Sequence, residues 1–165
     1  MSARPILRWP NRMLRTPAAP VEAVTDEIRA IWQDMIDTME AMPGVGLAAP
    51  QIGVGLRLCV VDASDERGWA VRMANPEIVS RSEAMNRHPE ASPCLPGVSA
   101  EVERPAEVTV RYLGEDGAVQ DRAFSGLWAT SVQHQIDHLD GKLYIERLSR
   151  TKRDMVLKRA KKVAS

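Results

Sequence analysis

The chain of 165 residues has few cysteines, no excess of charge of either sign and no long hydrophobic run. Its two cysteines, Cys59 and Cys94, stand in very different surroundings, which argues against a disulfide framework. No segment approaches the roughly 20 apolar residues of a membrane helix, and residues 1–10 lack the apolar centre of a signal peptide. The 22 basic and 22 acidic residues give no electrostatic attraction to DNA or to a membrane surface. We therefore expect a cytoplasmic protein that binds neither.

The patterns that are present predict one α+β domain over residues 1–165. Thr25 is a suitable N-cap, and the apolar residues after it recur at helical spacing: Ile28, Ile31, Trp32, Met35, Met39 and Met42. The first twenty residues contain four prolines, which predicts an extended arm. The other expected elements are strands at 56–62 and 69–73, a turn at Asn75–Pro76, an irregular segment at 82–98, a hairpin at 108–124, and helices at 126–140 and 151–163. This order predicts antiparallel strands packed around a central helix.

Positive charge gathers at the end of the chain. From Arg147 onward there are eight basic residues and only one acidic residue, Asp154, so this segment has a charge of about +7. The predicted helix at 151–163 has only a thin apolar strip. We expect a solvated helix docked by one edge; the alternative is contact with ribosomal RNA.

Two histidines four residues apart are the first chemical signal. His134 and His138 fall within the predicted helix at 126–140. Residues at this spacing differ in direction by only about 40°, so both imidazoles leave the same face and can chelate one metal ion. The same spacing also arises by chance on helices.

Cys94 strengthens the metal interpretation. It lies in the irregular segment Ser92–Pro96, where a thiol has no obvious packing role. Two imidazoles and one thiolate leave a fourth tetrahedral position open, which is typical of a catalytic metal site. The remaining candidate donors have no suitable spacing: we expect Cys59 to be a small core residue in a strand and His88 to be a loop residue.

A glycine-rich segment follows the first predicted helix. Gly44 and Gly46, on either side of Val45, allow a backbone to approach a ligand closely and to pair with it in strand fashion. Gln51 offers an amide that can donate a hydrogen bond to an oxyanion or position a water molecule. Such segments are common after helices, so this signal is weak when taken alone.

Together the three segments resemble the peptide deformylase family, metal hydrolases that remove the formyl group from the N-terminus of new bacterial polypeptides. Gly44–Gln51 matches the family motif G-x-G-L-A-A-x-Q. Cys94–Leu95 matches the centre of E-G-C-L-S, and His134–His138 matches H-E-x-D-H except at Gln135. The motifs follow in the family's order, and the resemblance covers nearly the whole chain.

The resemblance implies a cofactor, a substrate and site residues. One divalent metal, Fe(II) or Zn(II) with Ni or Co as substitutes, would be held by Cys94, His134 and His138 on a central metal-binding helix. The substrate would be the N-terminal peptide of a nascent polypeptide. The implied catalytic contacts are Gln51, the backbone of Leu95 and the general-base position at Gln135, and the implied peptide-binding residues are Gly44, Val45 and Gly46.

The chain departs from the family pattern at the general-base position and around the second motif. The family's general base is a glutamate; here Gln135 has nearly the same shape but cannot accept and return a proton. Losing a positioned general base costs about 10²–10⁴-fold in rate. The Glu-Gly of the second motif is Ser92–Pro93, the serine after it is Pro96, and residues 97–101 lack the arginine that helps hold the peptide in the family.

The face of the metal helix also differs from that of an ideal methionine pocket. Leu127, Thr130 and Ser131 lie seven, four and three residues before His134, so we expect them to share its face and to receive the first side chain of the substrate. Two hydroxyl groups make that pocket more polar.

We therefore expect a deformylase-like, metal-binding protein with little or no deformylase activity. One alternative is a slow hydrolase of formyl-Met peptides or of another N-acylated substrate. The second is a non-catalytic peptide- or ribosome-binding module, in which the basic helix contacts an anionic partner.

Overall fold

The computed structural model describes residues 2–164. The first helix, α1 (Asp26–Ala41), begins directly after Thr25, as the sequence predicts. The Thr25 hydroxyl accepts a hydrogen bond from the Ile28 N–H at 3.3 Å, as expected of an N-cap. The predicted apolar stripe is buried, except that Met42 lies just beyond the helix and is half-buried. This face packs against Leu58 and Val60 in one of three hydrophobic clusters.

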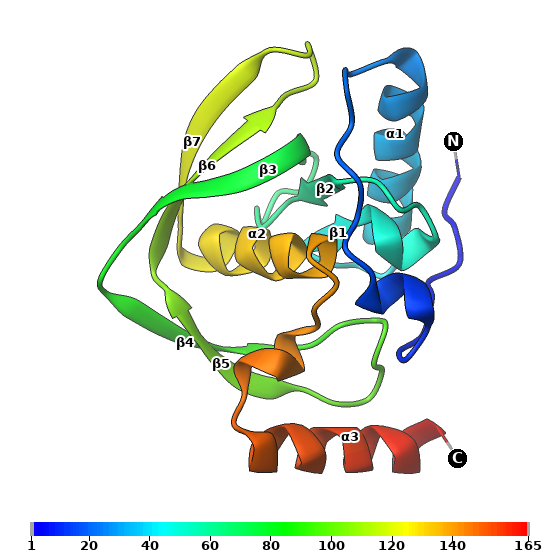
Figure 1. The fold of residues 1–165 in the computed structure, drawn as a ribbon, viewed down its shortest axis with the longest axis vertical. Coiled ribbons are helices and arrows are strands. Elements are labelled where there is room, and N and C mark those ends of the chain that lie inside the picture. Colours follow the sequence, from blue (N-terminus) through cyan, green and yellow to red (C-terminus); the bar gives the residue numbers. More distant parts are fainter. Residues whose placement is uncertain (1, 165) are drawn as a thin grey trace.

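Two antiparallel sheets surround the second helix (Figure 1). The larger sheet has the order β1-β2-β3-β6-β7, and the smaller one pairs β4 with β5. The strands are β1 (Gly46–Ala48), β2 (Leu58–Val61), β3 (Val71–Arg81), β4 (Met85–Glu90), β5 (Ala100–Pro105), β6 (Glu107–Leu113) and β7 (Val119–Ser125). Short 3₁₀ turns occur at Arg12–Arg15 (η1), Ala49–Ile52 (η2) and Tyr144–Arg147 (η3).

The central helix, α2 (Gly126–Leu139), is buried over most of its length. Its apolar residues Ala129, Val132, Ile136 and Leu139 share a cluster with strands of the larger sheet. Polar side chains on the same helix, among them His134 and His138, are therefore held inside the molecule. The predicted α+β arrangement of antiparallel strands around one helix is confirmed.

The last helix, α3 (Arg150–Ala164), lies along one edge of the molecule (Figure 1). Val156 is its one buried residue in the described part of the chain, with Leu157 and Ala160 partly buried beside it. The predicted apolar strip of Met155, Val156, Ala160 and Val163 docks only through Val156 and Ala160, whereas Met155 and Val163 are exposed. None of the helices formed by residues 2–164 has the length and apolarity required to cross a membrane.

Three local predictions are wrong. The segment 82–98, predicted to be irregular, contains β4, and His88 lies in this strand rather than in a loop. β3 continues through Asn75–Pro76 because a register shift between Ala74 and Glu77 accommodates the proline. The N-terminal arm includes the 3₁₀ turn η1, whose Leu14 is buried. Cys59, by contrast, is a fully buried strand residue as predicted.

Candidate metal centre and cleft

His134 and His138 lie one turn apart on α2, as their spacing predicts. Their ring centroids are 5.0 Å apart and both side chains are buried. Among residues 2–164, neither ring nitrogen of His138 has a hydrogen-bond partner. Burial, together with the neighbouring His134, holds the pKa of His138 well below its ordinary value of 6.5, so its imidazole is neutral at neutral pH. A neutral imidazole with unpartnered nitrogens is the form that binds a metal ion.

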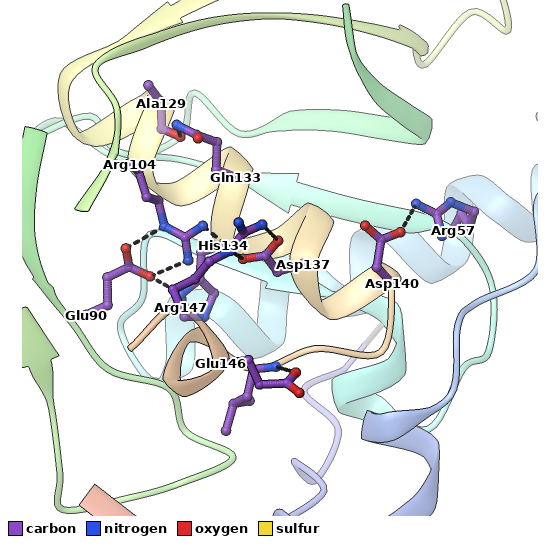
Figure 2. Close-up of polar contacts among 11 residues, drawn as sticks. Arg57, Glu90, Arg104, Ala129, Gln133, His134, Asp137, Asp140, Glu146 and Arg147 are labelled. Carbon is purple, nitrogen blue, oxygen red and sulfur yellow. Dashed lines mark hydrogen bonds and ion pairs between the residues drawn. The ribbon is translucent and has the colours of Figure 1, made fainter. Parts of the chain in front are cut away.

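Glu90 orients the other histidine (Figure 2). Its carboxylate lies 2.8 Å from Nδ1 of His134, and its two oxygens also accept hydrogen bonds from Arg104 at 2.6 and 2.9 Å. Burial raises the pKa of Glu90, but the hydrogen bonds from His134 and Arg104 outweigh it, so the pKa lies below the ordinary 4.5. A carboxylate on Nδ1 fixes the ring and leaves Nε2 for a ligand, the usual support of a metal-binding histidine.

Sequence reasoning missed Glu90. It lies four residues before Cys94, at the end of β4, whereas the family motif places its glutamate at the position of Ser92. No local pattern connects this residue to α2. The role follows from tertiary packing, which brings the end of β4 against the central helix.

Asp137 is held in a separate part of the same polar network (Figure 2). Arg104 contacts its carboxylate at 2.8 Å and Arg147 at 2.6 and 3.0 Å. Burial raises the pKa of Asp137, but the ion pairs with Arg147 and Arg104 lower it by more. The pKa of Asp137 therefore lies below the ordinary 3.8. A carboxylate paired with two guanidinium groups is a poor proton acceptor, so Asp137 is not suited to act as a general base.

Cys94 is paired with Gln51. The Gln51 Nε2 group donates to Cys94 Sγ at 3.4 Å, and its Oε1 accepts from the Ala48 N–H at 2.9 Å. Burial raises the pKa of the Cys94 thiol against the opposing hydrogen bonds of Gln51 and Ser92. The structure therefore joins the predicted glycine-rich segment to the predicted thiol ligand.

The three predicted ligands lie in two separate contacts. His134 lies against His138, and Cys94 accepts a hydrogen bond from Gln51, which is not a predicted ligand. Within residues 2–164, no group of three or more His, Cys, Asp and Glu side chains is close enough to hold a metal ion as it stands. The donor chemistry nevertheless fits a divalent metal, because His138 has two unpartnered nitrogens and Glu90 leaves Nε2 of His134 available.

Gln135 is buried beside β1. An added Cβ at Gly46 would lie only 2.5 Å from both Gln135 Nε2 and Ser131 Oγ, so a larger residue here would force these two side chains to move. Ser131 donates to the Val45 carbonyl oxygen at 2.8 Å. Oε1 of Gln135 is buried without a hydrogen-bond partner in the described part of the chain.

A cleft of about 580 Å³ runs past Gln135. One wall contains residues 42–46 and the other contains residues 89–93. Most of the residues predicted to bind substrate or metal or to act in catalysis line this cleft: Gly44, Val45, Gly46, Gln51, Leu127, Thr130, Ser131, His134 and Gln135. Leu127, Thr130 and Ser131 thus line the same cleft as His134.

Leu95 does not face this cleft. It lines a different groove, and its backbone N–H donates to the Ser92 carbonyl oxygen at 3.0 Å. As the structure stands, this N–H is not available as the predicted oxyanion contact. This hydrogen bond closes a turn from Ser92 to Leu95, with Pro93 and Cys94 at its centre.

Comparisons with known proteins agree with this arrangement. The family described as polypeptide deformylase matches residues 3–154. A peptide deformylase-like protein of Bradyrhizobium diazoefficiens is 44% identical over 164 residues, covering 99% of this chain and 96% of that protein. A peptide deformylase of Mesorhizobium japonicum is 45% identical over 166 residues, covering 99% and 94%.

Solved structures show the same fold. The peptide deformylase of Legionella pneumophila superposes with a TM-score of 0.92 at 39% identity, covering 99% of this chain and 96% of that one. The Ehrlichia chaffeensis enzyme in complex with actinonin gives a TM-score of 0.91 at 33% identity, with 98% of each chain covered. Sequence, fold and site agree, and the chain belongs to the peptide deformylase family.

Proposed function

We propose that this chain binds a divalent metal and a peptide N-terminus in the manner of its family, and that its deformylase activity is strongly impaired. The family reaction is hydrolysis of the N-formyl group of formyl-methionyl polypeptides. The observation that carries the proposal is Gln135: this buried amide lines the cleft where the family has its glutamate, and its Oε1 has no hydrogen-bond partner among residues 2–164.

Cys94, His134 and His138 would hold the metal, with Glu90 positioning His134. When bound, such an ion polarises a carbonyl group and lowers the pKa of water. Fe(II) and Zn(II), with Ni and Co as substitutes, all suit one thiolate and two imidazoles.

No neighbouring carboxylate takes over the proton transfer. Glu90 lines the cleft, but its oxygens are engaged by His134 and Arg104. Asp137 is engaged by two arginines. Gln135 can hold a hydrogen-bond partner in place but cannot cycle a proton, so we expect a rate lower by about 10²–10⁴-fold than with a glutamate.

The cleft supports peptide binding. β1, which begins at Gly46, is an edge strand of the larger sheet and can pair with an extended peptide, and Gly44, Val45 and Gln51 line the same space. Leu127, Thr130 and Ser131 would meet the first side chain. The two hydroxyl groups favour the alternative of a slow hydrolase acting on a more polar N-acylated substrate.

The basic helix α3 supports, only in part, the alternative of a non-catalytic ribosome-binding module. Most of the basic side chains of α3 are exposed, which would allow contact with ribosomal RNA. Truncation after Ser149, followed by a ribosome-sedimentation assay, separates this role from the cleft.

The test of the proposed function combines binding and turnover. The Fe(II)-loaded chain should bind actinonin, the compound bound in the Ehrlichia structure, yet hydrolyse a formyl-Met peptide only slowly. Rapid hydrolysis would contradict the proposal that deformylase activity is impaired. Absence of both metal and actinonin binding would contradict the proposal that the metal and peptide sites are retained.

A further inference from the structure

A second groove, of about 810 Å³, lies between α3 and the segments 8–10 and 94–96. Its volume falls within the range of about 300–1,000 Å³ that is typical of small-molecule sites. Its lining is mostly apolar: Trp9, Pro10, Leu95 and Pro96 on one side, and Leu157, Ala160, Val163 and Ala164 on the other.

Both walls of the groove are anchored. The Trp9 N–H donates to the Cys94 carbonyl oxygen at 2.9 Å, which fixes the N-terminal arm to segment 94–96 within one wall. Val156 is buried and holds α3 against the body of the protein. At the far end of the helix, a Cβ added to Gly97 would lie 2.6 Å from Val163 Cγ1, so helix and loop are in close contact. The groove is therefore a feature of the folded chain and not a gap beside a loose helix.

Positive charge surrounds this apolar surface. Arg8, Lys158 and Lys161 line the groove, and no Asp or Glu is found among the described residues of its lining. None of the three cations has an ion pair within residues 2–164. Unpaired cations beside an apolar floor attract a ligand that carries negative charge at one end and hydrocarbon over the rest.

We propose that this groove binds a single-chain anionic amphiphile, a carboxylate of the fatty-acid type. The hydrocarbon chain lies along Leu157, Ala160 and Leu95, and burial of its methylene groups supplies most of the affinity. The carboxylate lies at the cationic rim, where exposed ion pairs add little energy but select the sign of the head group. A nucleic acid would use the charges alone and would leave the apolar floor in contact with water.

The first experiment is titration calorimetry of the full chain with dodecanoate, kept below the concentration at which it forms micelles. We expect one molecule to bind per chain. Dodecyltrimethylammonium has the same hydrocarbon chain with the opposite charge, and butanoate has the same head group with little hydrocarbon. Each should bind at least tenfold more weakly than dodecanoate. Equal binding of either compound would overturn the proposal.

Variants of exposed residues locate the site. Lys158→Glu with Lys161→Glu should weaken dodecanoate binding at least tenfold, because both side chains line the groove. Lys152→Glu with Arg159→Glu makes the same change of charge at exposed positions of α3 outside the groove lining and should have little effect.

Filling the groove tests the apolar part without altering charge. Ala160→Trp places a large side chain in the space for the hydrocarbon and should abolish binding, while circular dichroism verifies that the helix is retained. Equal losses in the two charge variants, unchanged affinity in Ala160→Trp, or binding of an RNA oligonucleotide without any binding of dodecanoate would each overturn the proposal.

Discussion

Replacing Gln135 by glutamate changes an amide nitrogen to an oxygen at the one position where the cleft lacks a proton-cycling group. Gln135 is only 4% exposed and lines the cleft beside His134. The other nearby carboxylates are engaged by arginines. We therefore expect Gln135→Glu to raise the turnover of formyl-Met peptides by about ten- to a thousand-fold, within the range of about 10²–10⁴ for a general base.

The gain should be partial for structural reasons. Thr130 and Ser131 make the cleft more polar than a methionine side chain prefers, and Pro93 has no N–H to offer a peptide on the opposite wall. Both effects weaken binding of the substrate without touching the proton transfer. We therefore expect kcat to rise while KM stays high.

The assay is the rate of free amine release from a formyl-Met peptide by protein purified anaerobically and loaded with Fe(II). Gln135→Met, which has similar length and no proton to exchange, is the matched control and should not raise the rate. Gln135→Glu combined with His138→Ala should return to background and thus reveals any contaminating host enzyme. If Gln135→Glu stays at background with unchanged metal content, the missing base is not the main defect, and the altered segment 92–101 is the cause.

Three further predictions follow from the polar network. Cys94→Ala and His138→Ala should each remove the bound metal, measured by elemental analysis, and full metal content in both would show that the assigned ligands are wrong. Glu90→Gln should lower metal affinity by about 10–100-fold in a competition assay with a chelator, since it withdraws the support of His134; unchanged affinity would contradict that role. Arg104→Met should destabilise the fold by about 3–5 kcal/mol in denaturant unfolding at neutral pH, because it removes the shared guanidinium and leaves buried Glu90 with His134 and buried Asp137 with Arg147 alone; a smaller loss than about 1 kcal/mol would contradict it.

The same network has a defined dependence on pH. The folded pKa values of Glu90 and Asp137 lie below the ordinary 4.5 and 3.8. Their stabilisation is therefore present above these ordinary values and is lost as the pH falls through the folded ones. In denaturant titrations, Arg104→Met should lose less stability on acidification than the unmodified chain, and an unchanged dependence on pH would contradict this assignment.

Elements with local signals were predictable from the sequence. The stripe from Ile28 to Met39 determined α1, and the hairpin of β6 and β7 followed from a Gly-rich turn between two strand-like runs. The histidine spacing on α2 identified which helix face meets the cleft, because side-chain direction on a helix depends only on sequence separation.

Features that depend on distant partners were not predictable. β4 has few β-branched residues and is a strand only because Met85–Glu90 pairs with Ala100–Pro105. That pairing brings Glu90 to His134, so this contact could not be predicted from the local sequence. The hydrogen bond from the Leu95 N–H to the Ser92 carbonyl oxygen likewise required the structure. The family motifs located the thiol, but the contact between Cys94 and Gln51 required the structure.

A metal site that is retained beside a general base that is lost would give metal binding without efficient turnover. Both properties can be measured on one Fe(II)-loaded preparation, as metal content and as kcat/KM for a formyl-Met peptide, beside the Legionella pneumophila enzyme treated identically. We predict about one metal per chain and a kcat/KM lower by about 10²-fold or more. Full metal content with a kcat/KM equal to that of the Legionella enzyme would contradict the account.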